Sequence, residues 1–154
     1  MLRRVGDLRI EAIREEQYET LLPMIAAYQG FYEAKEIDPD RNRRFFSRFL
    51  EPSEEGLILG AWRDGELVGY ACLYWHHSST RAKDTVLLND LYVDGAARGE
   101  GVGRALIEAT RDVARKRGAD LVEWSTRPDN TAAQRLYDST GAEKSTWIEY
   151  ELPA

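Results

Sequence analysis

The chain has very little sulfur or imidazole: 154 residues contain one cysteine, Cys72, and two histidines. A single cysteine excludes an internal disulfide and suits a reducing compartment, so we expect a cytoplasmic location. Cys72 lies in an apolar stretch, which favours a buried core thiol over a nucleophile. No metal site is predicted.

Long apolar runs and excess positive charge are also missing. No run reaches the length of a membrane span, and the basic start Met1–Arg4 is not followed by an apolar stretch of signal-peptide type. A net charge of −6 argues against general nucleic-acid binding and is compatible with a cationic substrate. We therefore expect no membrane or nucleic-acid partner.

The residues that are present fit one domain, 1–154, with alternating strands and helices. Strands are predicted near 8–12, 57–62, 67–75, 85–93, 121–126 and 147–152, with a hairpin turn at Asp64-Gly65. Helices are predicted near 16–34, 45–50 and 131–139, and another ends at Gly118. His76 and His77 then fall in a loop between strands.

Three glycines at alternate positions, Gly99, Gly101 and Gly103, stand between the predicted strand 85–93 and the next helix. Free N–H groups and the helix dipole favour an anion at such a turn, and the missing Cβ atoms let a pyrophosphate approach. A Walker loop would need Lys-Ser or Lys-Thr after the last glycine, where Arg104-Ala105 stands. A Rossmann fingerprint would need glycine where Leu106 stands. A glycine turn without a ligand is the alternative interpretation.

The remaining pattern, Arg-x-x-Gly-x-Gly from Arg98 to Gly103, resembles the acetyl-CoA pyrophosphate loop of the GCN5-related N-acetyltransferases (GNAT). That family also carries an Asn, a Leu-Tyr pair on the following helix, and a glycine pair before the next strand. Here Asn130, Leu136-Tyr137 and Gly141-Ala142 stand in that order. Taken without the resemblance, Asn130 is an ordinary helix N-cap and Tyr137 a half-buried aromatic residue.

The resemblance implies an α/β (α+β) GNAT fold, a mixed and mostly antiparallel sheet flanked by helices, with acetyl-CoA as co-substrate. The implied cofactor-binding residues are Leu91, Tyr92, Val93, Arg98, Gly99, Gly101, Val102, Gly103, Arg104 and Asn130. Tyr137 takes the role of the acid that protonates the departing thiolate, since a phenol stays protonated at neutral pH. Proximity of the two reactants supplies much of the rate, and a backbone N–H near Leu91 binds the carbonyl oxygen.

The general base stays open. Leu88–Val93 resembles the spermidine/spermine acetyltransferase branch, but Asn89 stands where that branch has Glu and cannot accept a proton. Strand alternation is expected to point the adjacent Asp90 to the opposite face. Glu123 on the neighbouring strand, or water alone, is the remaining candidate, so Asn89 and Glu123 are assigned only to substrate binding. The two histidines are expected to be solvated.

The predicted function is transfer of an acetyl group from acetyl-CoA to a primary amine of a small molecule, such as a polyamine or an amino acid. The alternatives are a protein or peptide N-acetyltransferase and a non-catalytic acyl-CoA sensor. The strand 147–152 alternates apolar and polar residues and has nothing after it to cover its edge, which predicts a homodimer held partly by Tyr150 and Leu152. Gly103→Glu is expected to abolish acetyl-CoA binding while leaving the fold intact.

Overall fold

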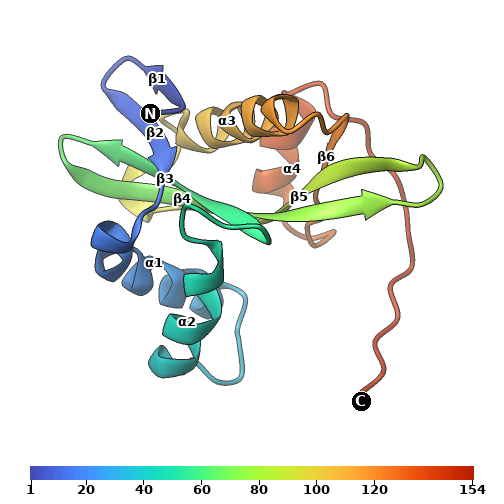
Figure 1. Cartoon of the computed structure of the whole chain (residues 1–154), viewed down its shortest axis with the longest axis horizontal. Coiled ribbons are helices and arrows are strands. Elements are labelled where there is room, and N and C mark those ends of the chain that lie inside the picture. Colours follow the sequence, from blue (N-terminus) through green and yellow to red (C-terminus); the bar gives the residue numbers. More distant parts are fainter.

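A six-stranded sheet forms the centre of the molecule in the computed structural model, which describes residues 1–154 (Figure 1). Its spatial order follows the chain: β1 (Arg3–Val5), β2 (Leu8–Ala12), β3 (Gly56–Arg63), β4 (Glu66–Ser78), β5 (Lys83–Val93) and β6 (Leu121–Glu123). All neighbours are antiparallel except β5 and β6, which are parallel because α3 connects them. The predicted mixed, mostly antiparallel sheet is confirmed.

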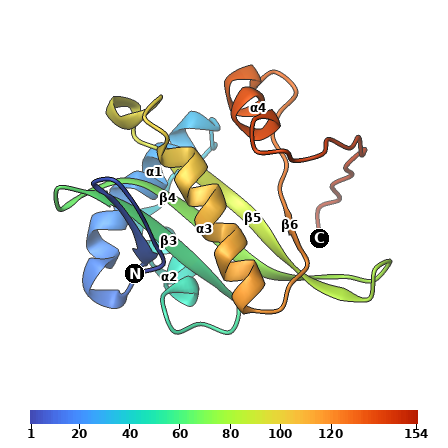
Figure 2. The ribbon, with the colours of Figure 1, turned by 90° about the horizontal axis from the view of Figure 1, so that it is seen from above.

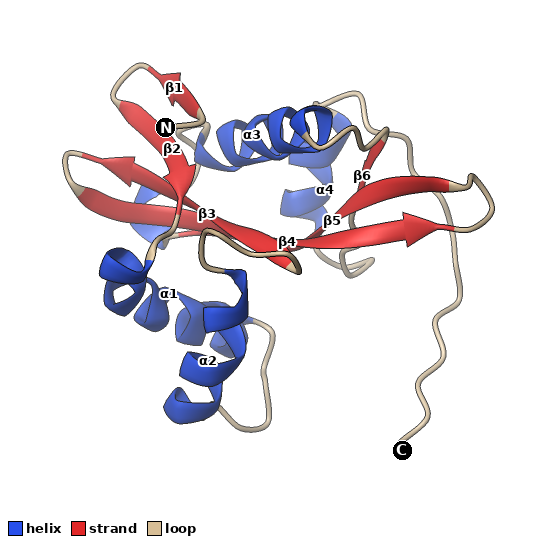
Figure 3. Cartoon of the chain, viewed as in Figure 1, coloured by secondary structure: helices blue, strands red, loops and turns tan.

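Helices cover both faces of this sheet (Figures 1 and 3). They are α1 (Tyr18–Phe31), α2 (Pro39–Phe46), α3 (Val102–Lys116) and α4 (Thr131–Asp138), with short 3₁₀ turns at Glu15–Gln17, Ser47–Phe49 and Gly95–Ala97. The alternation of side chains along each strand divides the core into two apolar clusters. One lies under α3, around Leu73, Val86 and Leu106; the other lies under α1 and α2, around Ile25, Ile58 and Tyr70. None of the helices is long and apolar enough to cross a membrane.

Two predicted boundaries differ from the structure. The second helix begins at Pro39 rather than near Phe45, because Asp38 caps it by accepting hydrogen bonds from the Asp40 and Arg41 N–H groups. The first turns of that helix contain only proline and polar residues, so a search for apolar residues at helical spacing does not find them. The histidines do not lie in a loop: β4 continues through them, and His76 and His77 face Thr85 and Asp84 of β5.

The predicted strand 147–152 is wrong. The chain beyond α4 forms no helix or strand, and it extends away from the sheet (Figures 1 and 2). Alternation of residue types supplies a suitable face but no hydrogen-bond partner, and no strand of this chain lies beside the segment. Its apolar side chains are therefore exposed: Trp147 by 84%, Ile148 by 79%, Tyr150 by 91% and Leu152 by 92%.

Candidate active site

The site begins where β5 and β6 part. Their parallel pairing covers only Thr85–Leu87 and Leu121–Glu123, after which the chain from β6 leads away to α4 (Figure 2). β5 continues to Val93 with β4 on one side and no strand on the other. The predicted cofactor-binding residues Leu91, Tyr92 and Val93 lie on this open edge, where main-chain groups can receive an extended ligand in the manner of an added strand.

The glycine turn follows directly and forms the N-terminus of α3. Gly99 and Gly101 have φ of +80° and +81°, a region that favours glycine, and Gly101 is the N-cap. None of the backbone N–H groups from Gly99 to Arg104 donates a hydrogen bond within the chain; the first helical bond is from the Ala105 N–H to the Gly101 oxygen. Free donors at the positive end of a 15-residue helix form an anion site, which fits the pyrophosphate of acetyl-CoA.

Gly103 differs from the other two glycines because it is a packing position. A Cβ built there would lie 2.9 Å from Cδ2 of Leu136 on α4, whereas at Gly99 and Gly101 it would meet nothing within 4 Å. The near atom is the end of a flexible, half-buried side chain, so a Cβ at 103 would displace the Leu136 methyl group. The expectation that Gly103→Glu leaves the fold intact stays a prediction.

The two arginines assigned to the phosphates make contacts on opposite sides of the glycine turn. Nε of Arg98 donates to the Val93 oxygen at 3.1 Å, and its guanidinium lies 5.8 Å from the ring centres of both Phe31 and Tyr92. Arg104 donates to the Ser139 carbonyl at 3.0 Å and thereby joins α3 to the end of α4. Both side chains are exposed beside the free N–H groups.

α4 carries the candidate acid, Tyr137. Asn130 caps this helix by accepting from the Ala133 N–H at 3.2 Å, so its side chain has a structural role in the chain itself. The Tyr137 ring packs edge-on against Trp124, with ring centres 5.4 Å apart. No hydrogen bond within the chain involves its hydroxyl. Burial, and secondarily the nearby Tyr32, raise the pKa of Tyr137 to about 12, which keeps the phenol protonated at neutral pH.

Strand alternation predicted that Asp90 points to the face opposite Asn89, and this prediction is wrong. The β4–β5 register shifts between Cys72 and Leu73: Cys72 faces Asp90 and Leu73 faces Leu88, so Asn89 is the extra residue of a β-bulge. The bulge brings the side chains of Asn89 and Asp90 together, with the Asn89 amide 2.8 Å from an Asp90 carboxylate oxygen. The same amide lies 3.3 Å from the Tyr74 hydroxyl.

The Asp90 side chain is buried, with 4% of the residue exposed, and it has no ion-pair partner in the chain. Burial raises its pKa to about 6, although the hydrogen bond from Asn89 and the nearby Tyr28 act in the opposite direction. A carboxylate held in this way is partly ionised near neutral pH, which suits a proton acceptor.

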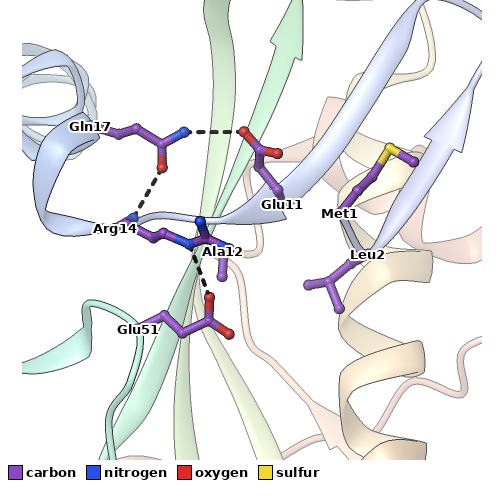
Figure 4. A pocket seen from close by; sticks show the side chains of 7 residues that line it. All are labelled: Met1, Leu2, Glu11, Ala12, Arg14, Gln17 and Glu51. Atoms are coloured by element: carbon purple, nitrogen blue, oxygen red, sulfur yellow. Dashed lines mark hydrogen bonds and ion pairs between the residues drawn. The ribbon is translucent and has the colours of Figure 1, made fainter.

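The other acidic candidate, Glu123, is engaged elsewhere. Its carboxylate oxygens lie 3.7 Å from Nδ1 of His76 and 3.9 Å from the Arg81 guanidinium. These contacts hold Glu123 toward the projecting end of the β4–β5 hairpin, and no contact joins it to Asn89. The chain also has a pocket on the opposite edge of the sheet, beside β2 (Figure 4). Its polar side chains pair with one another, Arg14 with Glu51 and Gln17 with Glu11. We therefore do not assign it a catalytic role.

Sequence reasoning missed the tyrosine cluster beside Asp90. Tyr28 on α1 and Tyr32, the C-cap of that helix, have ring centres 4.9 Å apart, and Tyr28 lies 6.1 Å from Tyr70 and 6.3 Å from Tyr92. The available signal was the tyrosine pair four residues apart on a helix that also carries the core residues. Its connection to Asp90 depends on packing between distant segments.

The chain matches the acetyltransferase (GNAT) family over residues 12–142. It is 32% identical over 146 residues to the uncharacterized N-acetyltransferase YhfO of Bacillus subtilis, covering 94% of this chain and 97% of that protein. It is 33% identical over 130 residues to the D-amino-acid N-acetyltransferase HPA3 of Saccharomyces cerevisiae, covering 83% and 80%. A crystal structure of a probable acetyltransferase superposes with a TM-score of 0.84 at 32% identity, covering 95% and 97%.

GNAT acetyltransferases use acetyl-CoA, and the free N–H groups before α3 and the open edge of β5 fit such a ligand. The match covers both motifs and the whole sheet from β3 to β6. The chain belongs to the GNAT family and is an N-acetyltransferase.

Proposed function

We propose that the protein transfers an acetyl group from acetyl-CoA directly to a primary amine of a small molecule, with both substrates bound together. The observation that carries the proposal is that the unbonded N–H groups from Gly99 to Arg104 follow directly on the open edge of β5. Tyr137, with its unbonded hydroxyl, lies on α4 next to Leu136, which faces Gly103 of α3. When bound, acetyl-CoA supplies an activated thioester. The chain supplies binding, orientation and proton transfer.

The proposed roles follow from this placement. The N–H groups of Gly99, Gly101, Val102 and Gly103 hold the pyrophosphate, and Arg98 and Arg104 flank it. The main chain of Leu91–Val93 holds the pantetheine arm, and the Leu91 N–H stabilises the carbonyl oxygen. Tyr137 gives its proton to the departing thiolate. Asn130 positions α4 and, with it, Tyr137.

A small amine is the proposed acceptor. HPA3, named as a D-amino-acid N-acetyltransferase, supports amino acids. A second relative, over 45% of this chain, is named L-2,4-diaminobutyric acid acetyltransferase. Polyamines stay a prediction that depends on the resemblance of Leu88–Val93 to the spermidine/spermine branch.

The test is a panel of polyamines, D- and L-amino acids, aminoglycosides and peptides with acetyl-CoA, followed by thiol release and product mass. We expect acetylated small amines in equal amount to released CoA. Turnover of peptides alone would make the protein a peptide acetyltransferase. Tight acetyl-CoA binding without any turnover would make it a sensor.

We also keep the homodimer as a proposal, on changed grounds. The C-terminal segment is not an edge strand of its own sheet, but it exposes four large apolar side chains. Such a patch is usually covered by another protein surface, and a second copy is always present. The cytoplasm is the proposed location because a chain with one cysteine forms no internal disulfide and suits a reducing compartment.

A further inference from the structure

The environment of Asp90 is unusual for a buried carboxylate because it holds no cation. The groups that face Asp90 are Tyr28 on α1, Tyr70, Cys72 and Tyr74 on β4, and Asn89 on β5. None of them carries a positive charge, and no Lys, Arg or His forms an ion pair with Asp90. A buried ionised carboxylate is costly unless a cation accompanies it.

A second observation at the same place is the Tyr70 hydroxyl. Tyr70 is fully buried, and its hydroxyl has no hydrogen-bond partner. Buried hydroxyl groups are nearly always bonded, so an orphan one beside an uncompensated carboxylate indicates a missing polar partner. A group that donates two hydrogen bonds and carries positive charge would satisfy both.

Tyr28 connects this place with the candidate acid. The pKa of Tyr28 is raised by burial first and then by the nearby Asp90 carboxylate. The Tyr28 ring lies 4.9 Å from that of Tyr32, and Tyr32 in turn raises the pKa of Tyr137. A nitrogen held at Asp90 would lie on the face of the sheet that α1 covers.

Resting on the proposed function, we propose that Asp90 and Tyr70 receive the ammonium group of the acceptor and that Asp90 is the general base of the reaction. One N–H bond of the ammonium breaks, the proton forms an O–H bond on Asp90, and the electron pair stays on nitrogen for attack on the thioester. Asp90 later gives this proton to solvent. The second proton that nitrogen loses on becoming an amide replaces the one that Tyr137 gives to the thiolate. Asn89 acts as a positioning residue, because its amide holds the carboxylate.

The main test is Asp90→Asn, assayed with the most active amine of the panel over pH 5–9. In the wild type kcat/KM should fall as pH drops through about 6, where Asp90 takes up a proton. The variant should lose at least about a hundredfold in kcat/KM and should lack this acidic limb, while acetyl-CoA affinity is unchanged. Asp84→Asn, an exposed aspartate on the same strand, is the matched control and should behave as wild type.

Two further variants separate chemistry from packing. Tyr70→Phe removes only the unbonded hydroxyl, so the protein should be equally or more heat-stable, yet kcat/KM should fall at least about tenfold. Asn89→Ala removes a donor that lowers the pKa of Asp90, so the acidic limb should move to higher pH.

The proposal is overturned if folded Asp90→Asn and Tyr70→Phe proteins keep wild-type kcat/KM and pH profiles. If Asp90→Asn does not fold, the aspartate carboxyl groups of ¹³C-labelled wild-type protein are titrated by NMR instead. The absence of a carboxyl group that titrates near pH 6 would contradict the proposal. Absence of wild-type turnover with every amine would instead contradict the proposed function.

Discussion

At the scale of single residues, Tyr137 carries the most direct prediction. Tyr137→Phe keeps the ring that packs on Trp124 and removes only the proton donor. We expect kcat to fall at least about tenfold, since general acid catalysis is typically worth a hundredfold or more. Acetyl-CoA affinity, measured by calorimetry, should change little. A normal kcat with the true acceptor would leave Tyr137 a packing residue.

Asp90 also makes a prediction about stability. Its folded-state pKa of about 6 lies above its ordinary value of 3.8, so the folded protein binds the proton more tightly than the unfolded chain. The associated stability is fully present below pH 3.8 and is lost as pH rises through about 6. Asp90→Asn should therefore be more stable than wild type by about 3 kcal/mol at pH 8, with the difference vanishing near pH 4.

Urea unfolding of both proteins at the two pH values measures that difference. Because only residue 90 changes, the pH dependence of all other groups cancels. A constant difference across the pH range would mean that Asp90 titrates normally in the folded protein.

The residue scale also shows the limit of sequence reasoning. The strand predicted over 85–93 is confirmed, and its Val86 and Leu88 enter the core under α3. Strand alternation fails for Asp90, because the bulge inserts one residue into β5. No residue type in Leu88–Val93 indicates a bulge. Tyr28 and Tyr70 were not predictable as site residues, since helix α1 and strand β4 meet only in the folded protein.

At the scale of elements, the turn before α3 separates two effects of glycine. Gly101→Ala places a side chain at φ +81° with nothing within 4 Å, so the cost is backbone strain of about 1–2 kcal/mol and not a clash. We expect a folded protein whose acetyl-CoA dissociation constant rises at least about tenfold, because the strained turn no longer holds its N–H groups in place.

Gly118→Ala is the matched control for this prediction. Gly118 has φ +73° and open space just beyond the C-terminal end of α3, at the opposite end of that helix from the site. It should lose similar thermal stability and keep acetyl-CoA affinity. Equal affinity in both variants would exclude the glycine turn as the pyrophosphate site.

Element boundaries were predictable where a local signal ends them. Gly118 ends α3 at φ +73°, and Asp64-Gly65 turns the hairpin, both as predicted. β1 was not predicted because its three residues are too few to show an alternation of apolar and polar side chains. β6 is shorter than predicted because the chain turns toward α4 after Glu123.

At the scale of the whole molecule, the C-terminal segment decides the assembly. Trp147, Ile148, Tyr150 and Leu152 contribute little to the fold because they are exposed. Replacing all four with serine should leave the melting temperature of the folded domain nearly unchanged and convert a homodimer to a monomer. Light scattering measures this; a wild-type mass near 17.6 kDa at micromolar concentration contradicts the dimer.

The bulge at Asn89 has a consequence for how this enzyme can change. In a regular strand, moving a carboxylate by one residue would transfer it to the other side of the sheet. Here two consecutive positions, 89 and 90, share one side, so a functional group can migrate between neighbours while the ladder stays as it is. The double exchange Asn89→Asp with Asp90→Asn tests such migration. Relatives that differ at positions 89 and 90 can then keep the same carboxylate function, although a sequence alignment would assign that function to different positions.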